Sequence, residues 1–310
     1  MSSDVEARVA EAYVDLRPLL FSIAYRMLGS VSEAEDVVQE AFVRYQRALA
    51  DGTAVESPKA YLSAVATRLA IDQLKSARVR RETYVGEWLP EPLVTDEGAG
   101  DPAAHAALAD SLSMSFLVLL ERLTPVERAV FLLHDVFGYG YDEVSDVVGK
   151  SEDNTRQVAV RARRHVDDQR PRFEASREER ERLADRFFEA IEEGDTDGLV
   201  GLLAQDVVIY GDGGGKAPSW RRIYGRDNVS RILLGVGNQL GKLDVTLRRT
   251  EINGQPGAMF HDREGRLISV FSLDVADGVV QTIRGIVNPD KLGHLGPLAD
   301  LRALLRESKG

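Results

Sequence analysis

The glycine-rich run DGGGK at residues 212–216 is the stretch of this chain that most resembles a phosphate-binding loop. The P-loop of nucleotide-binding enzymes needs a glycine, four intervening residues and then Gly-Lys-Ser/Thr, whose hydroxyl binds magnesium. Here only three residues separate the corresponding glycines, and Ala217 stands in place of the hydroxyl residue. Pro218 also disfavours a helix whose dipole could hold a phosphate. The spacing therefore predicts a tight turn after a strand at 207–211, not a nucleotide site.

The segment YDEVSDVVGKSEDNTRQVAVRARRHV (141–166) has the pattern of a helix-turn-helix. Two short helical stretches are joined by a turn at Gly149, and Ser151 can cap the second helix. One face of that helix carries small residues, whereas the opposite face carries Arg156, Gln157, Val160, Arg161 and Arg164. Glutamine and arginine on such a helix reach base edges or phosphates in the major groove. A plain helical hairpin is the alternative, and the segregated basic face favours DNA recognition.

The charge distribution is compatible with a polyanionic partner although the net charge of the 310-residue chain is −11. Residues 59–82 carry six basic and two acidic side chains, and residues 150–166 carry five and two, so each segment is positive. Two basic segments in an acidic chain can bind a nucleic acid locally while the remainder suppresses non-specific association. Ordinary solvated helix faces could have the same composition.

The composition excludes several classes of protein. The absence of cysteine rules out disulfides, thiolate metal sites and cysteine nucleophiles, and fits a reducing cytoplasm. The apolar run at 19–28 contains Arg26 and is too short to cross a bilayer. The first residues lack the basic-then-apolar order of a signal peptide. We expect a cytoplasmic protein with no membrane association, no metal and no cofactor.

The positions of helix and strand signals divide the chain into parts. Serine or threonine followed three residues later by glutamate predicts a helix start, and this pattern occurs at 32–35, 124–127 and 176–179. A stretch rich in proline, glycine and acidic residues at 86–102 predicts a linker. Beyond residue 177 we expect two helices, a later helix at 227–240, and strands near 206–212, 243–253, 256–263, 266–275 and 278–288. Helices followed by a mostly antiparallel sheet indicate an α+β domain.

Three helical segments resemble the parts of RNA polymerase sigma factors. The stretch AEDVVQEAFVRYQRA (34–48) resembles their polymerase-binding helix, SPKAYLSAVATRLAIDQLKSARVRRE (57–82) resembles the −10 element helix, and residues 120–164 resemble the −35 domain. The order and spacing of these motifs are similar to those of the extracytoplasmic-function (group IV) sigma factors, over roughly residues 10–166. The resemblance implies a transcription initiation factor whose partners are core RNA polymerase and promoter DNA.

The resemblance also implies roles for individual residues. The residues expected to face the β′ clamp helices of the polymerase are Asp36, Gln39 and Glu40. Those expected to line the −10 contact are Arg68, Asp72, Lys75, Arg78 and Arg81, and those expected at the −35 element are Arg156, Gln157, Arg161 and Arg164. The loop at 50–58 would hold a base flipped from the non-template strand. Many group members have asparagine where this chain has Arg68, and arginine prefers guanine or phosphate to adenine, so the −10 preference departs from the family pattern.

Three further motifs resemble markers of one subgroup, the SigJ-like factors with a fused SnoaL-like C-terminal domain. They are WLPEP (88–92), DGGGK (212–216) and NPDKL (288–292). The fold implied is multidomain: two all-α sigma domains, the second with a helix-turn-helix, and an α+β, cone-shaped SnoaL/NTF2-like domain with a pocket at its mouth. The expected parts are 1–85 (region 2), 86–110 (linker), 111–170 (region 4), 177–295 (SnoaL-like domain) and 296–310 (tail).

The role of the C-terminal domain is open between two interpretations. Related cone folds include isomerases and cyclases, and Tyr210, Asp212, His261 and Asp290 could supply an acid or base. We favour turn caps and a strand end for these side chains, and an ion pair between Asp212 and Lys216 that works against a neutral acid. The chain is then no enzyme. The alternative is a SnoaL-like isomerase or cyclase fused to a DNA-binding module.

The preferred hypothesis is regulation by a tethered domain. A short tether gives a high effective concentration, so a weak contact of the C-terminal domain with the sigma regions or with WLPEP could hold a closed form. The residues expected in this regulatory or pocket region are Trp88, Leu89, Pro90, Asp212, Lys216, Asn288 and Asp290. The pocket is a candidate site for a small-molecule ligand. A conventional repressor with a ligand domain is a third interpretation, which the polymerase-facing helix at 34–48 argues against.

Overall fold

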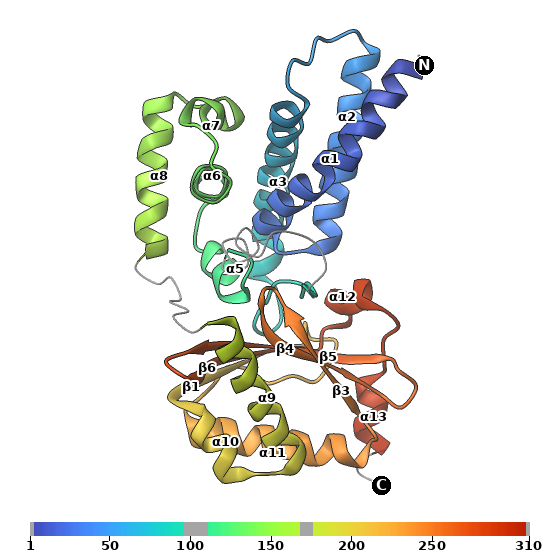
Figure 1. Cartoon of the computed structure of the whole chain (residues 1–310), viewed down its shortest axis with the longest axis vertical. Coiled ribbons are helices and arrows are strands. Elements are labelled where there is room, and N and C mark those ends of the chain that lie inside the picture. The colour runs from blue at the N-terminus through green and yellow to red at the C-terminus, as the bar shows by residue number, and fades with distance from the viewer. Residues whose placement is uncertain (1–2, 96–110, 168–175, 308–310) are drawn as a thin grey trace. The chain divides into compact units, whose positions relative to one another are not determined.

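The computed structural model describes residues 3–95, 111–167 and 176–307, apart from the side chains of residues 3, 77–82, 167, 240 and 307. The chain forms two compact units (Figure 1). The first comprises Met1–Thr83 with Leu117–Arg170, and the second comprises Tyr84–Phe116 with Pro171–Gly310. No helix in the described part of the chain is long and apolar enough to cross a membrane.

The first half of the first unit is a bundle of three helices, α1 (Ser3–Leu28), α2 (Val31–Ala50) and α3 (Pro58–Glu82). The apolar stripe expected on α2 is buried, because residues at helical spacing from Val37 to Tyr45 face α1 and α3. The predicted cap of α2 at Ser32 is wrong by two positions. Ser30 has the extended backbone of a cap, and its hydroxyl accepts the N–H of Glu33 at 3.2 Å.

The second half of the first unit contains the predicted helix-turn-helix. The elements in chain order are α5 (Met114–Leu120), α6 (Pro125–Phe131), a π-helical turn (Leu132–Val136), α7 (Tyr141–Val148) and α8 (Glu152–Asp167). The helix-turn-helix consists of α7 and α8. Thr124 forms the capping box expected for α6. Gly149 ends α7 in the left-handed region at φ 66°, where glycine is unstrained, and Ser151 accepts the N–H of Asn154 at 3.3 Å.

The two halves of the first unit pack against each other through α3, which contacts α6 and α7. Ser63 on α3 shares a buried 2.8 Å hydrogen bond with the hydroxyl of Tyr139. Arg128 on α6 is buried and donates to the carbonyl of Met27 at the end of α1, at 2.7 Å. The charged group of Arg128 is compensated by carbonyls and by Glu121, as a buried guanidinium requires. The halves therefore form one body in this structure.

The second unit is an α+β domain around a six-stranded sheet. The helices are α9 (Arg177–Glu193), α10 (Thr196–Leu202), α11 (Arg226–Lys242), α12 (Pro289–Leu292) and α13 (Leu301–Glu307). The strands are β1 (Leu203–Asp212), β2 (Ile223–Tyr224), β3 (Thr246–Ile252), β4 (Gln255–His261), β5 (Leu267–Ala276) and β6 (Val279–Ile286). The strand order is β2-β1-β6-β5-β4-β3, with β1 parallel to β6 and the other pairs antiparallel.

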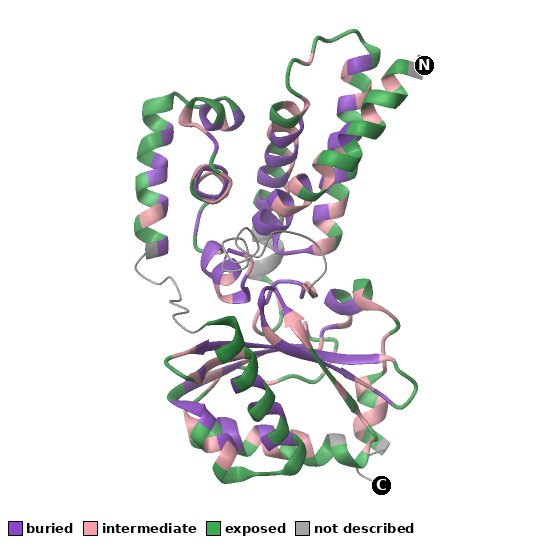
Figure 2. Ribbon diagram, viewed as in Figure 1, coloured by how far each residue is buried: buried purple, intermediate pink, exposed green. Residues whose placement is uncertain are grey.

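The core of the second unit lies between the sheet and α9, α10 and α11 (Figure 2). Apolar residues of these helices meet inward-facing residues of β1, β4, β5 and β6, among them Phe187, Phe188, Ile209 and Phe271. The α9 helix begins at the predicted capping box, where Ser176 accepts the N–H of Glu179. The five strands expected from the sequence are present to within four residues at each end, and the two-residue strand β2 was missed.

The predicted tail at 296–310 is wrong for its described part. Leu267 donates its N–H to the carbonyl of Pro297 at 2.8 Å, and Leu298 makes a bridge to Leu267. Leu301 and Leu304 of α13 then pack against the core. Their spacing of three residues gives the short helix an apolar side, which explains why it folds onto the domain.

The predicted linker at 86–110 is corrected in its first part, and residues 96–110 lie outside the described residues. Val94 pairs antiparallel with Ile252, and the N–H of Thr95 donates to the carbonyl of Glu251 at 2.9 Å. Residues 93–95 thus extend the sheet beyond β3, its edge strand, and satisfy backbone groups that an open edge would leave exposed.

Candidate functional site

The DGGGK motif forms the turn that its spacing predicts. Gly214 and Gly215 have φ values of 57° and 72°, and the N–H groups of Lys216 and Ala217 donate to the carbonyl of Gly213 at 2.9 and 3.0 Å. A Cβ at Gly214 would collide with the side chain of Asn288. Glycine is needed here for the left-handed backbone and for the close approach of the NPDKL motif.

Asp212, the first residue of that motif, is the centre of a buried network. Its side chain is fully buried. One carboxylate oxygen accepts the hydroxyl of Tyr84 at 2.5 Å, and the other accepts the N–H of Leu89 at 2.9 Å. Its carbonyl accepts the N–H groups of Val287 and Asn288 at 2.9 and 3.0 Å. A single residue therefore joins the WLPEP and NPDKL segments to the end of β1.

Lys291 supplies the positive charge that this buried carboxylate requires. Its ammonium lies 2.7 Å from Asp212 and also donates to the carbonyl of Leu89. The same ammonium lies 4.9 Å from the ring centroid of Tyr84 and 4.4 Å from that of Trp88, both cation–π distances. Burial, followed by the hydrogen bond to Asp212, raises the pKa of Tyr84 well above its usual range, so the phenol stays protonated and donates.

The sequence-predicted pair of Lys216 with Asp212 is wrong. Lys216 forms an exposed pair with Asp290, at 2.6 Å, because the DGGGK turn carries its lysine away from the buried carboxylate. Asn288 caps the short helix α12 by accepting the N–H of Asp290, and its amide donates to the hydroxyl of Tyr84 at 2.8 Å. Pro90 is buried. The seven residues predicted for the regulatory or pocket region all lie in the three segments that this network joins, and their regulatory role stays a prediction.

Asn253, in the turn between β3 and β4, fastens the same chain segment at two further points. Its backbone N–H donates to the carbonyl of Leu93 at 2.8 Å, and its side-chain oxygen accepts the N–H of Leu93 at 2.9 Å. Its side-chain amide donates to the carbonyl of Leu112 at 3.1 Å. Asn253 is fully buried and has a φ of 54°, a conformation that asparagine tolerates better than most residues. One side chain thereby holds both ends of the segment 93–112.

The basic face predicted on α8 is exposed. Thr155, Ala159, Ala162 and Val166 are buried against the rest of the helix-turn-helix. The residues expected at the −35 element point outward: Arg156, Gln157, Arg161 and Arg164. Arg156 is held by Glu152 one turn earlier and lies over the ring of Tyr141, and Arg161 is 3.8 Å from Glu127.

The residues predicted at the −10 contact have different partners along α3. Arg68 donates to the carbonyls of Val147 and Asp146, at 2.9 and 2.6 Å, at the carboxyl end of α7. An arginine is favourable there because it meets the negative end of the helix dipole. Asp72 and Lys75 form an exposed pair at 2.8 Å. Arg78 and Arg81 lie outside the described side chains.

The residues predicted to face the polymerase lie on the outer side of α2. Asp36 and Gln39 are exposed, and Glu40 is half-buried and pairs with Arg44 at 2.8 Å. Such exposed pairs contribute little to stability, so these carboxylates are available for a partner.

The candidate acid–base residues of the C-terminal domain lie outside the lining of the three cavities described for it. Asp212 is bound by Lys291, and Asp290 by Lys216. Tyr210 lies beneath the guanidinium groups of Arg222 and Arg284. Burial, followed by the nearby charge of Arg248, lowers the pKa of His261. None of the four candidates lines the described cavities of this domain.

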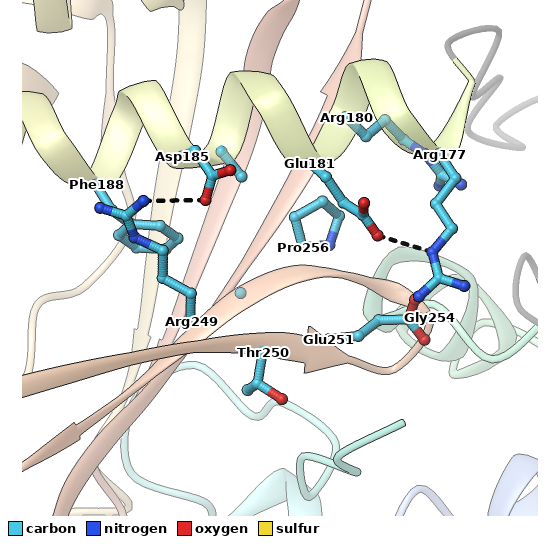
Figure 3. Close-up of a pocket in the computed structure, with 12 residues that line it drawn as sticks. Arg177, Arg180, Glu181, Asp185, Phe188, Arg249, Thr250, Glu251, Gly254 and Pro256 are labelled. Atoms are coloured by element: carbon cyan, nitrogen blue, oxygen red, sulfur yellow. Dashed lines mark hydrogen bonds and ion pairs between the residues drawn. The ribbon is translucent and has the colours of Figure 1, made fainter. Parts of the chain in front are cut away.

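A polar cleft of about 510 Å³ lies between α9 and the strands β3 and β4 (Figure 3). Arg177 pairs with Glu181 at 2.8 Å, and Arg249 with Asp185 at 3.1 Å. Arg249 lies on β3 and Asp185 on α9, and Arg177 of α9 is also 3.1 Å from Glu251 of β3, so these ion pairs fasten α9 to the sheet. No group of three or more potential metal-ligating His, Asp or Glu side chains gathers among the described residues.

Three residues of the network were not predicted from the sequence: Tyr84, Asn253 and Lys291. Lys291 belongs to NPDKL, so its position in the motif was a usable signal. Asn253-Gly254 is a typical two-residue hairpin turn, which indicates the left-handed asparagine but not its partners. Tyr84 lies before the motif and carried no signal.

Three family descriptions match this chain. Residues 12–80 match Sigma-70 region 2, residues 113–166 match Sigma-70, region 4, and residues 184–287 match the SnoaL-like domain. The helical regions and the α+β domain of the structure coincide with these matches, which confirms the predicted fold class.

Relatives extend over nearly the whole chain. The ECF RNA polymerase sigma factor SigJ of Mycobacterium tuberculosis (strain ATCC 25618 / H37Rv) is 39% identical over 297 residues, covering 93% of this chain and 94% of the relative. A probable ECF RNA polymerase sigma factor, SigI of the same strain, is 31% identical over 93% of this chain and 96% of its own length. The crystal structure of Mycobacterium tuberculosis SigJ matches with a TM-score of 0.74 at 37% identity, covering 94% of this chain and all of that one. The chain belongs to the extracytoplasmic-function RNA polymerase sigma factors, with a SnoaL-like domain fused to its sigma regions.

Proposed function

We propose that the fused C-terminal domain controls this sigma factor by holding the segment between its two promoter-binding regions in a folded form. In the active form α2 contacts the β′ clamp helices of core polymerase through Asp36, Gln39 and Glu40. The α3 helix contacts the −10 element, and α8 contacts the −35 element. The observation that carries the proposal is the double attachment of Leu93 and Leu112 to Asn253.

The arrangement of the sigma regions supports a closed form. The −10 and −35 elements lie about 25 base pairs apart, which is about 85 Å of duplex. In this structure α3 packs directly against α6 and α7, and Arg68 is bound to backbone carbonyls of α7. A protein in this form cannot place α3 and α8 on both elements at once. The contacts of Arg68, and the buried pair of Ser63 with Tyr139, must break before both elements are bound.

The reach of the intervening segment supports a role for Asn253. A chain running freely from residue 83 to residue 117 spans at most about 120 Å. Attachment of Leu93 and Leu112 to Asn253, taken alone, leaves at most the ten residues from 83 to 93 and the five from 112 to 117 free to extend. Their combined reach is about 50 Å, less than half of the free value. The folded sigma regions span part of the distance between the two promoter elements. Attachment to Asn253 shortens the chain that is available to span the remainder.

The buried network around Asp212 holds the first part of this segment. Tyr84 enters the network two residues after the end of α3, so the tether from the −10 helix to the C-terminal domain is reduced to little more than Thr83. A shorter tether raises the effective concentration of the attached domain. The WLPEP motif is thereby the attachment point of the regulatory domain.

The proposal is tested with purified core RNA polymerase and two chains, the full length and a form ending at residue 175. Both are examined for association with core polymerase and for transcription from promoters selected from a random library by the full-length holoenzyme. We expect both chains to bind core polymerase and to differ in promoter output. Equal output would remove the regulatory role, and failure of either chain to bind core polymerase at low salt would remove the assignment of α2.

A further inference from the structure

The C-terminal domain contains an apolar cavity that the network around Asp212 does not use. Its volume is about 490 Å³, within the usual range of about 300–1,000 Å³ for small-molecule sites. Three aromatic rings line it, from Trp220, Phe260 and Phe271, with Phe271 packed edge-on against the other two. The remaining walls come from α11, from β5 and from the leucines of α13. A site built from five elements of one domain is suited to a compact molecule and not to a peptide segment.

Polar groups occur at only a few points of this cavity. Ser269 is 6% exposed and lines the wall of the cavity. A hydroxyl on the wall of an otherwise apolar cavity can form one directional hydrogen bond with a ligand group. Arg231 and Gln239 lie at the exposed rim on α11. None of the described lining residues carries a carboxylate or an imidazole, so the cavity is suited to binding and lacks a general acid or base.

We propose that this cavity binds a compact, largely apolar small molecule that contains an aromatic ring and one hydrogen-bonding group placed against Ser269. The three rings favour an aromatic ligand through offset or edge-to-face contacts. Arg231 at the rim disfavours a cationic ligand. The proposal names the ligand class of the regulatory domain, and its regulatory consequence rests on the proposed function, whereas its binding chemistry does not.

The cavity is connected to the regulatory network through shared elements. Ser219 and Trp220 of the cavity wall follow the DGGGK turn directly, and Val287 of the wall donates its N–H to Asp212. A second cavity of about 200 Å³ shares Ile268, Val287 and Leu301 with the first and is lined also by Lys216 and Pro289. A ligand that displaces α13 or the Trp220 loop would therefore shift residues that hold Asp212 and Asn288.

The test uses the full-length protein and the neutral fluorescent probe N-phenyl-1-naphthylamine, which has aromatic rings and one N–H group. We expect saturable binding with one probe per chain. Gly235 lines the cavity and a Cβ there meets open space, so Gly235→Leu should fill the site without strain and weaken binding at least tenfold. Gly241→Leu is the matched control, because Gly241 lies on the same helix in open space and outside the cavity lining. Thermal unfolding verifies that both variants fold.

Ser269→Ala tests the hydrogen-bonding group separately, and we expect it to weaken probe binding about two- to tenfold. Absence of saturable binding to the wild type, or equal binding by the Gly235→Leu and wild-type chains, would overturn the ligand site. Unchanged affinity in Ser269→Ala would overturn the assignment of the hydroxyl. Binding is measured without polymerase or promoter, so these outcomes are independent of whether the C-terminal domain regulates transcription.

Discussion

At the scale of single residues, the pair of Asp212 and Lys291 is the most consequential feature of the C-terminal domain. Both side chains are almost completely buried. A buried ion pair adds little net stability relative to apolar residues, yet removal of one partner costs about 3–5 kcal/mol because a charge is left without compensation. A single substitution of either residue should therefore weaken the attachment of segment 84–95 to the C-terminal domain.

Asp212→Asn should release the segment 84–95 from the C-terminal domain. The substitution keeps the shape of the side chain but leaves Lys291 without its counter-charge. We expect hydrogen exchange at the amide of Leu89, which donates to Asp212, to accelerate at least tenfold. Asp290→Asn is the control, since it removes only an exposed pair with Lys216, worth at most about 1 kcal/mol. Equal exchange at Leu89 in the two variants would contradict the central position of Asp212.

The sequence identified the motif residues of this network but not their pairing. Lys216 and Asp212 are four residues apart, and nothing local shows that the turn directs the lysine away from the buried carboxylate. Lys291 reaches Asp212 only because β1 and β6 are neighbouring parallel strands. The partners of Asn253 are likewise about 140 to 160 residues away in the sequence. Such contacts depend on tertiary structure, which periodicity and turn signals do not encode.

At the scale of elements, the helix-turn-helix is the part whose sequence prediction is most complete. Capping residues, the left-handed glycine and the small buried face are all local signals, and the structure contains each of them. The strand-like stretch at 93–95 and the helix α13 were missed because they lack such local signals. Both are short, and both are stabilised by contacts with the sheet and core of the C-terminal domain.

The α8 helix offers a matched pair of neighbouring arginines. Arg164 is exposed, whereas Arg163 is bound to Asp135 at 2.6 Å and to the hydroxyl of Tyr141. We expect Arg164→Ala to weaken promoter binding and to reduce the slope of log affinity against log salt by about 1, because one phosphate contact is lost. The measurement is holoenzyme affinity for the selected promoter at several salt concentrations. An unchanged slope in Arg164→Ala would show that Arg164 does not contact DNA. Arg163→Ala is the control, which we expect to lower the stability of the protein and to leave the slope unchanged.

At the scale of the whole molecule, the proposed function requires a change of arrangement within the sigma regions. The contacts between α3 and α7 hold the regions together, and their separation is needed to reach two promoter elements. Because the hydrogen bonds of Arg68 close this arrangement, the same arginine serves the closed form here and is expected at the −10 element in the open form. If Arg68 contacts the −10 element as predicted, promoter DNA competes with α7 for this side chain.

Arg68→Ala should shift the free protein towards the open form. The chain contains no cysteine, so spin labels can be placed at Glu56→Cys and Lys150→Cys, both exposed positions of the first unit. We expect a larger population of long label-to-label distances in Arg68→Ala, because two hydrogen bonds to α7 are lost. Lys75→Ala, on the same helix and bound only to its neighbour Asp72, should match the parent distribution. Identical distributions for all three chains would exclude Arg68 as a closing contact.

The most direct test of control through the attachment of Leu93 and Leu112 to Asn253 is transcription by full-length variants of Asn253. Asn253→Gly keeps the left-handed backbone but deletes the side chain that binds Leu93 and Leu112. Asp277→Gly is the control, since Asp277 has a similar φ of 53° in an exposed turn without this role. With core polymerase and the selected promoter, we expect Asn253→Gly to raise single-round output severalfold and Asp277→Gly to match the wild type. Output from Asn253→Gly equal to that of the wild type would contradict the account.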